Sequence, residues 1–417
     1  MRRSAFLAGT AAGYSTVFSP YAIAAPGTTV TLGYLDSASG VLSDIGGYHA
    51  IGVKLALAEA NASGRVKWAL VSGDDNSKPQ TGINEAHRLI DQERVDALLF
   101  GTSSAVALAI TPIALEAGVF TLLIGPQDTS LAADHATATA FRFAQDCAMF
   151  TKAVGQRILA GGKKWYFVVE DFAFGKDAYA RLSALLKRAG GTEVGADVLR
   201  VGTSDFSSTM TKIRNTDTEQ VVLCQGGLDV AVAARAFVDF GLHKKMRLAG
   251  MTLEDFYAKT LPLDQLAGSV FASLWMPSVS PSARALHDKL GRAIGGPVSN
   301  RHYLGYLSTK QLIDRISAAG TTNADKLIAA FAGHRYDSAR ENLSTWRACD
   351  HQSAHDTYAG EVVSAARFRK TGYLLDVVGT AEANDAAGSC ASPEASAASR
   401  AIASRRPGER EGKAVPR

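Results

Sequence analysis

Short apolar runs, each followed by a helical pattern, recur along the chain and restrict its fold more than any other feature. The runs are apolar at both alternating positions, which is typical of strands whose two faces are both covered by helices. Strands that alternate with helices indicate βαβ units and parallel sheets. We therefore predict an α/β fold built from doubly wound parallel sheets. The expected strands are Val30–Leu35, Trp68–Val71, Val95–Phe100, Val119–Ile124, Trp165–Val169, Val221–Cys224, Met246–Ala249 and Val270–Leu274.

An internal similarity indicates two lobes of like topology. Val95–Val119 and Thr218–Leu242 both read as a strand, a turn, an apolar helix and an acidic residue two places before glycine. Those glycines, Gly118 and Gly241, suit the left-handed position that ends many helices. Two copies of one unit predict two lobes. Chance similarity between buried βα units remains the alternative, because buried strands resemble one another.

Length and charge limit the class of protein. The 417 residues, 47% of them hydrophobic and 20% charged, suffice for two or three ordinary globular domains. The net charge is +4, and three of these charges lie near the ends, in Arg2, Arg3 and residues 381–417. We therefore expect no nucleic-acid-binding face.

The four cysteines lie far apart and form no CxxC motif. Cys224 ends an apolar run, so we expect it to be a buried free thiol. Cys349 and Cys390 lie in polar stretches and could form a disulfide in an oxidising compartment, but sequence alone does not give connectivity.

Both ends of the chain differ from the middle. Arg2 and Arg3 precede a mildly apolar stretch and the small residues at 22–24, which predicts a signal peptide at residues 1–24 that is removed after export to the periplasm. The paired arginines resemble a twin-arginine signal, and the general secretory route remains open. Residues 391–417 contain almost no large apolar side chain, so we expect a disordered tail.

In open parallel sheets, ligands bind beyond the carboxyl ends of the strands, where helices begin. In the first lobe the loops there contain Asp36, Ser103 with Ser104, and Gln127 with Asp128 and Thr129. At least one of the two serines should cap the helix that follows. The same helix end could hold a ligand carboxylate through hydroxyl groups, main-chain N–H groups and the helix dipole.

The corresponding loops of the second lobe supply Phe172 and Phe174, Gly227 and Asp229, and Thr252. A phenylalanine beside a turn commonly belongs to the core. Two of them near a glycine in a strand-end loop could equally face a ligand. We include all five among the candidate ligand-binding residues.

Motifs of catalysis are absent from the sequence: there is no GxGxxG after a strand, no phosphate loop, no GxSxG and no HExxH. Asp350-His351 and His355 have an i, i+4 spacing that could hold a metal on a helix. However, no third ligand is evident, and exposed polar histidines are commonplace. Asp74 and Asp75 more plausibly form a turn than a calcium site. We therefore predict no catalytic residue, metal or cofactor, and a binding protein in preference to an enzyme.

The motifs together resemble one family over residues 28–380, in their order and spacing. The chain is similar to the type I periplasmic solute-binding proteins of ABC transporters, in the leucine/isoleucine/valine-binding branch. The segments that carry the resemblance are Asp36–Gly47, Asp74–Gln80, Val95–Gly118, Phe141-Arg142, Asp171–Gly175, Asp205–Ser208 and Arg347–Gln352.

The resemblance implies two α/β lobes joined by three crossovers, with residues 28–146 plus 278–340 in one and 147–277 plus 341–380 in the other. A monomer would capture a small ligand between the lobes and deliver it to a membrane permease. Ser104 would bind the ligand carboxylate, helped by the loop Gln127–Thr129. A receptor of the same fold that signals remains the alternative, although no transmembrane or DNA-binding segment is evident.

One departure from the family bears on the ligand. The amino-acid binders place a glutamate, which pairs with the ligand's ammonium group, where this chain has Thr252. An unpaired buried ammonium is costly. Ile45, Phe174 and Leu228 stand where tyrosines are common. The resemblance therefore implies a carboxylate with an apolar or aromatic body, in preference to leucine.

Overall fold

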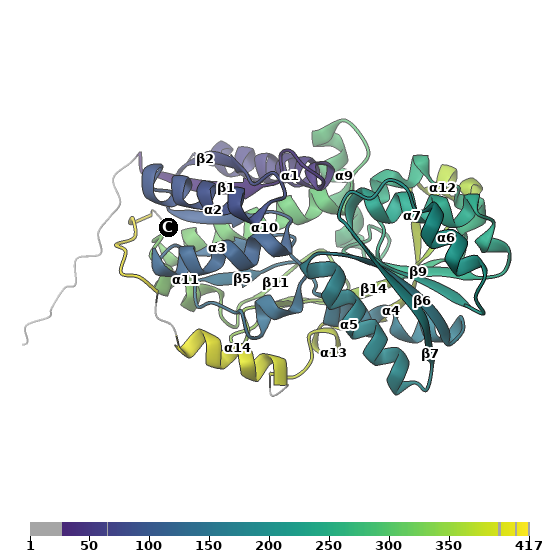
Figure 1. Ribbon diagram of the computed structural model, residues 1–417. Coiled ribbons are helices and arrows are strands. Elements are labelled where there is room, and N and C mark those ends of the chain that lie inside the picture. The colour runs from purple at the N-terminus through teal and green to yellow at the C-terminus, as the bar shows by residue number, and fades with distance from the viewer. Residues whose placement is uncertain (1–26, 65, 391–392, 405–406, 416–417) are drawn as a thin grey trace, which may run out of the picture.

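The structure is a computed structural model that describes residues 27–64, 66–390, 393–404 and 407–415. Two α/β lobes lie side by side, and helices cover both faces of the main sheets (Figure 1). The signal peptide expected at residues 1–24 lies outside the described residues. None of the described helices is long and apolar enough to cross a membrane.

The first lobe contains a five-stranded parallel sheet in the order β2-β1-β3-β4-β5. One face, with Val30 and Leu99, packs under α1 and α10, and the other, with Leu35 and Leu98, packs under α2 and α3. Its elements are β1 (Thr29–Asp36), α1 (Ser43–Ala62), β2 (Lys67–Asp74), α2 (Pro79–His87), η1 (Arg88–Gln92), β3 (Ala97–Phe100), α3 (Ser104–Glu116), β4 (Thr121–Leu123), η2 (Thr129–Ala132), β5 (Ala140–Arg142), α9 (Pro281–Ile294), α10 (Asn300–Ala319) and α11 (Ala324–Phe331).

The second lobe contains a seven-stranded sheet in the order β15-β14-β10-β9-β8-β6-β7, in which β14 runs antiparallel to both of its neighbours, β10 and β15. Phe167 and Val169 face α4 and α5, while Tyr166 and Val168 face α6 and α7. Its elements are α4 (Cys147–Ala160), β6 (Lys164–Glu170), α5 (Ala173–Arg188), β7 (Thr192–Leu199), α6 (Ser207–Arg214), β8 (Gln220–Cys224), α7 (Gly227–Asp239), η3 (Leu242–Lys244), β9 (Arg247–Thr252), η4 (Asp255–Thr260), α8 (Leu263–Leu266), β10 (Val270–Ser273), β14 (Thr357–Val362), α12 (Ala365–Thr371), β15 (Leu375–Ala381) and α13 (Ala383–Ala387).

The two lobes repeat one strand order, which confirms the α/β prediction. The order β2-β1-β3-β4-β5 of the first lobe recurs as β7-β6-β8-β9-β10 in the second. The similar sequences Val95–Val119 and Thr218–Leu242 supply β3–α3 and β8–α7, which occupy equivalent places. Gly118 and Gly241 have φ of +63° and +71°, as their helix-end position requires.

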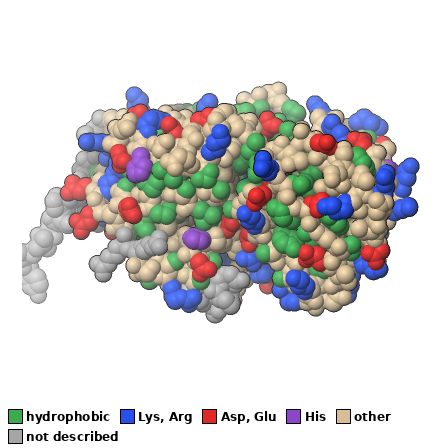
Figure 2. Space-filling model, in the orientation of Figure 1, with side chains coloured by type: hydrophobic (Ala, Val, Ile, Leu, Met, Phe, Trp, Pro, Cys, Tyr) green, Lys and Arg blue, Asp and Glu red, His purple; other side chains and the backbone are tan. Residues whose placement is uncertain are grey.

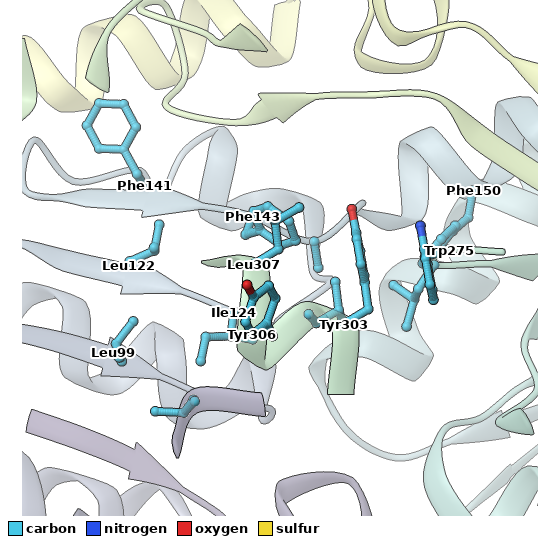
Figure 3. Packing of buried hydrophobic residues seen from close by; sticks show 14 of the residues in the cluster. Leu99, Leu122, Ile124, Phe141, Phe143, Phe150, Trp275, Tyr303, Tyr306 and Leu307 are labelled. Atoms are coloured by element: carbon cyan, nitrogen blue, oxygen red, sulfur yellow. The ribbon is translucent and has the colours of Figure 1, made fainter. Parts of the chain in front are cut away.

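The chain passes between the lobes three times, as the resemblance implied. The crossings lie between β5 and α4, between β10 and α9, and between β13 (Ser353–Ala354) and β14. Trp275, in the second crossing, stacks on Tyr303 of α10 with ring centroids 4.4 Å apart (Figure 3). Its indole N–H also donates to the Ala339 carbonyl over 2.8 Å. The second crossing is therefore anchored in the buried core.

The second-lobe boundary expected at residue 341 is wrong. A small sheet formed by β11 (Arg335–Tyr336), β12 (Ser344–Trp346) and β13 (Ser353–Ala354) lies against the first lobe. Trp346 of this sheet contacts Phe141 and Phe331, and Arg142 of β5 bridges to Gln352. The buried indole fixes this segment to the first lobe, and the chain enters the second lobe at β14.

The expectation of a disordered tail is also wrong for the described residues beyond 392. Helix α14 (Pro393–Ser404) lies along the first lobe (Figure 1). Further on, Val415 is buried in the main core, and Lys413 pairs with Asp96 over 2.8 Å. This segment is held on the first lobe with few apolar residues because its backbone forms hydrogen bonds to that lobe. One of them joins the Gly408 N–H to the Leu115 carbonyl.

The cysteines adopt one of the arrangements left open by the sequence. Cys349 and Cys390 form a disulfide, with their Cα atoms 5.8 Å apart. Cys224 is a buried free thiol, as predicted, and Cys147 is buried and free as well. The disulfide joins the small sheet of the first lobe to the start of the tail.

Candidate functional site

The strand-end loops of the two lobes meet at a small cavity of about 30 Å³. The first lobe contributes Leu42, Ile45, Thr102, Ser104, Gly125, Gln127 and Arg301, and the second contributes Phe172, Phe174, Gly226, Gly227 and Thr252. Six residues predicted from the sequence therefore meet there: Ser104, Gln127, Phe172, Phe174, Gly227 and Thr252. Parallel strands explain this, because their carboxyl ends share one edge of each sheet.

Ser104 lines the cavity, and its hydroxyl group keeps a hydrogen-bond donor. Its hydroxyl oxygen accepts the main-chain N–H groups of Gln127 and Asp128, over 3.1 and 3.2 Å. A hydroxyl has two acceptor sites and one donor, so the donor remains for the cavity. The cap of α3 is instead Ser103, whose side chain accepts the Val106 N–H. Ser103 therefore caps the helix, whereas Ser104 binds the loop at Gln127 and Asp128.

Gln127 adds a second polar group. Its Nε2 amide is buried and has no hydrogen-bond partner in the described part of the chain, although the residue lines the cavity. A buried donor without a partner costs free energy unless a bound molecule supplies an acceptor. The structure therefore leaves one buried donor of a lining residue without a partner.

Arg301, in the first turn of α10, lines the cavity and was missed by the sequence analysis. Its Nε and Nη2 groups donate to the Glu254 carboxylate, and both side chains are buried. Nη1 lies outside this pair and keeps its donors. Glu254 follows β9, so the ion pair also joins the two lobes. The signal in the sequence was a cation in the first turn of a helix, where the dipole disfavours it.

Apart from Thr252, the second-lobe wall is formed by phenylalanine and glycine residues, and it carries no acidic side chain. Phe172 and Phe174 lie with ring centroids 5.9 Å apart. Gly227 has φ of +58°, and a Cβ there would lie 3.3 Å from Leu42 Cδ2 of the opposite lobe. Both the backbone conformation and the close approach of the lobes therefore favour glycine. Leu228 is exposed and takes no part in the wall.

Five predicted site residues do not line the cavity, and polar groups of each of them bond to other groups of the protein. Asp36 accepts hydrogen bonds from the Tyr34 hydroxyl and the Ser37 N–H, and Asp128 accepts the Ser130 N–H. The others are Ser103, the cap of α3; Thr129, whose N–H donates to Asp177; and Asp229, which accepts the Gly202 N–H.

A buried carboxyl group supports the second-lobe loop from below. Glu170, at the end of β6, accepts the Gly226 N–H over 2.8 Å. Burial raises the pKa of Glu170, and the neighbouring Asp229 carboxyl group raises it as well. Both effects favour the protonated form of this group, which carries no negative charge.

The metal interpretation of residues 350–355 is not supported by the geometry. Asp350 pairs with Arg347 over 2.7 Å, and His351 stacks on Phe141 with ring centroids 3.9 Å apart. Among the described residues, no group of three His, Cys, Asp or Glu side chains could hold a metal ion. Asp74 forms the predicted turn, since its carboxylate accepts the N–H group of Asn76, two residues further on, over 2.9 Å.

The buried His351 predicts a pH dependence of stability. Burial lowers the pKa of His351 to about 4, against about 6.5 in the unfolded chain. The unfolded chain therefore binds more protons between these values, so stability falls as the pH drops from 6.5 towards 4. We expect this residue to contribute about 2 kcal/mol to the loss of unfolding free energy between pH 7.5 and 5.

Urea unfolding of the wild type and of His351→Asn at pH 7.5 and pH 5 measures this contribution. Asparagine tolerates the positive φ of +57° found here and does not titrate. The variant should lose about 2 kcal/mol less than the wild type over this range. Equal losses in both proteins would contradict the burial of a neutral imidazole.

Comparison with known sequences agrees with this geometry. A family model described as periplasmic binding protein matches residues 29–367. An amino acid binding protein of Pseudomonas aeruginosa is 24% identical over 319 residues, which cover 73% of this chain and 83% of that protein. Leu/Ile/Val-binding protein homolog 6 of Brucella melitensis is 25% identical over 365 residues, which cover 84% of this chain and 91% of that protein.

Solved structures share the fold. A periplasmic binding protein from Burkholderia mallei has a TM-score of 0.80 and 25% identity, covering 86% of this chain and 96% of its own. A solute-binding protein from Rhodopseudomonas palustris HaA2, in complex with p-hydroxybenzoic acid, has a TM-score of 0.77 and 21% identity, covering 86% of this chain and 98% of its own. On the family match and the two-lobed fold, the chain belongs to the type I periplasmic binding proteins.

Proposed function

We propose that this protein is the solute-binding component of an ABC transporter, which captures a small carboxylate with an aromatic or apolar body and delivers it to a membrane permease. The observation that carries the proposal is the composition of the cavity wall. It holds one guanidinium group, two phenylalanines and no acidic side chain.

The carboxylate end of the ligand would lie against the first lobe. The Ser104 hydroxyl, the Nη1 group of Arg301 and the N–H groups at the start of α3 are donors there, and the helix dipole favours an anion at the same place. Hydrogen bonds between charged partners of this kind are stronger than neutral ones. The ligand body would lie between Phe172 and Phe174 of the second lobe.

The ligand would carry no ammonium group. Thr252 lines the cavity where the family's amino-acid binders have a glutamate, and Glu254 is already paired with Arg301. Both ligand classes occur among related proteins: one is an amino acid binding protein, and one structure is a complex with p-hydroxybenzoic acid. The missing carboxylate favours the aromatic acid.

Capture would involve movement of the lobes. A cavity of about 30 Å³ holds only a few water molecules, which is less than a benzoate needs. The lobes would separate to admit the ligand and settle around it, and contacts to both lobes would favour the closed arrangement.

Calorimetric titration of the mature protein with 4-hydroxybenzoate and with leucine tests the ligand class. The proposal predicts binding of the aromatic acid and no measurable binding of leucine. Tight leucine binding would overturn the ligand assignment.

Loss of uptake of the bound acid on deletion of the gene would support transport, and unchanged uptake would favour signalling. Mass spectrometry of the exported protein tests cleavage after Ala24.

The neighbouring serines provide a matched pair of variants. Ser104→Ala should weaken binding of 4-hydroxybenzoate by roughly 1.5–3 kcal/mol, because a hydrogen bond to a charged group is lost. It should also lower stability, since two main-chain N–H groups lose their acceptor. Ser103→Ala should cost only a helix cap, ~1 kcal/mol of stability, and leave binding unchanged. Equal effects of both variants on binding, measured by calorimetry, would contradict the donor role of Ser104.

Thr252→Glu should move the ligand preference towards amino acids. The new carboxylate would supply a partner for the ammonium group of leucine, whereas 4-hydroxybenzoate has no cationic group to pair with it. We expect the ratio of the leucine Kd to the 4-hydroxybenzoate Kd to fall at least about tenfold, the change that one charge-assisted hydrogen bond can produce. Thr252→Gln is the control, because it has a similar size without the charge. An identical ratio in both variants would contradict the explanation.

A further inference from the structure

A pair of buried carboxyl groups lies behind the second-lobe wall of the interlobe cavity. Glu170 ends β6 and is 1% exposed, and Asp229 lies in the first turn of α7 and is 6% exposed. Their side chains form a hydrogen bond with each other. We propose that Glu170 and Asp229 share one proton and position the wall loop Gly226–Gly227, so that capture of an anionic ligand depends on this proton.

The pair joins the loops that follow three neighbouring strands of the second lobe. Glu170, at the end of β6, accepts the N–H of Gly226, which follows β8, over 2.8 Å. Asp229 accepts the N–H of Gly202, which follows β7, over 2.7 Å. The wall loop lines the cavity, whereas Glu170 and Asp229 do not. The two carboxyl groups are therefore positioning residues that act on a ligand through the loop.

The surroundings of the pair favour one shared proton. A hydrogen bond between two carboxyl groups needs a proton, and two ionised carboxylates in contact repel each other. The groups that act on Glu170 and Asp229 include no cation of the described part of the chain. On the face shown in Figure 2, by contrast, basic and acidic side chains are interspersed over both lobes. Burial also raises the pKa of both carboxyl groups.

The other elements packed around Glu170 supply no charge. Leu199 of β7 is its register partner, and Cys224 ends the adjacent β8. Burial raises the pKa of the Cys224 thiol, which therefore stays neutral. Gly175 of α5 approaches the Glu170 carbonyl group, and across the lobe boundary the wall loop faces the apolar Leu42. Among these described neighbours, the ionisation of Glu170 is therefore governed by its partner carboxyl group.

Loss of the shared proton would change the wall of the cavity. It would add a negative charge behind the wall loop and leave two carboxylates there that repel each other. A ligand carboxylate would then meet a more negative wall. This step rests on the proposed function. If that function holds, proton binding and ligand binding favour each other, because coupling between two binding events is reciprocal. The affinity for an anionic ligand should therefore fall as the pH rises.

Benzoate is the probe, because its carboxylate stays ionised and it lacks the phenol group of 4-hydroxybenzoate, which titrates in the range of tyrosine. Calorimetric titration from pH 6 to 9.5 should show the wild-type Kd rising at least about fivefold, the lower end of typical coupling. Glu170→Gln should give a nearly flat profile, because its carbonyl group can accept the Gly226 N–H while its NH₂ group donates to Asp229. Asp229→Asn is the reciprocal variant and should flatten the profile in the same way. Asp239→Asn, at an exposed position of the same helix, is the control and should keep the wild-type slope.

Urea unfolding without ligand tests the pair separately from the proposed function. A carboxyl group whose pKa is raised in the folded protein loses its contribution to stability as the pH rises through that pKa. The wild type should therefore lose more unfolding free energy between pH 6 and 9.5 than Glu170→Gln does. A flat wild-type Kd profile, or the same slope in the wild type and Glu170→Gln, would overturn the proposal. If benzoate binds at no pH, the proposed function fails, and equal losses of stability in the two proteins would then overturn the shared proton as well.

Discussion

Replacing Arg301 by methionine is expected to abolish measurable binding of 4-hydroxybenzoate and to lower the free energy of unfolding by about 3–5 kcal/mol. Binding is lost because the cavity has no other cation. Stability is lost because Glu254, which is 1% exposed, would keep a buried charge without its partner. Calorimetric titration and urea unfolding measure the two effects.

A double variant separates the two roles. Arg301→Met with Glu254→Leu replaces the buried ion pair by apolar side chains, a change that is often neutral for stability. We expect it to recover most of the unfolding free energy and none of the affinity. Recovery of both would mean that Arg301 only holds the lobes together and does not contact the ligand.

Loss of the disulfide is expected to cost about 4 kcal/mol of unfolding free energy. The bond between Cys349 and Cys390 closes a segment with a sequence separation of 41 residues, and the estimate follows from the chain entropy of a loop of that length. The double variant Cys349→Ser with Cys390→Ser should show this loss in urea unfolding.

The reducing agent provides the control. Dithiothreitol should destabilise the wild type to the level of the double variant and leave the double variant unchanged. The affinity for 4-hydroxybenzoate should change far less, because neither cysteine lines the interlobe cavity. A reduced wild type as stable as the oxidised protein would show that the tail is held by its other contacts alone, such as the buried Val415 and the Lys413–Asp96 pair.

The fold was predictable because its strands are buried on both faces. All eight expected runs form strands, since an apolar run bounded by turns can satisfy its backbone and its side chains only inside a sheet. The strands that were missed, such as β7 (Thr192–Leu199) and β15 (Leu375–Ala381), lie at the edges of the second sheet and are only partly buried. Their mixed composition gives no comparable signal.

The site was predictable only where chain position determines it. Ser104 and Phe174 follow strand ends, so the topology alone brings them to the cleft. Asp36 and Asp229 also follow strand ends, but their carboxylates accept main-chain N–H groups of the loops. A sequence does not distinguish an aspartate that stabilises a turn from one that binds a ligand.

Arg301 and the docked tail required the tertiary structure. Arg301 begins a helix far along the chain from the strand-end loops, and its approach to the cavity depends on how α10 packs on α1. Val415 is a single apolar residue in a polar segment. Its burial follows from a surface of the first lobe that no local pattern reveals.

A crystal structure of the mature protein with 4-hydroxybenzoate tests the central claim most directly. We expect the ligand carboxylate within hydrogen-bond distance of Ser104 Oγ and Arg301 Nη1, with the aromatic ring beside Phe172 and Phe174. A carboxylate placed against the second lobe, or a ligand bound outside the interlobe cleft, would contradict the account.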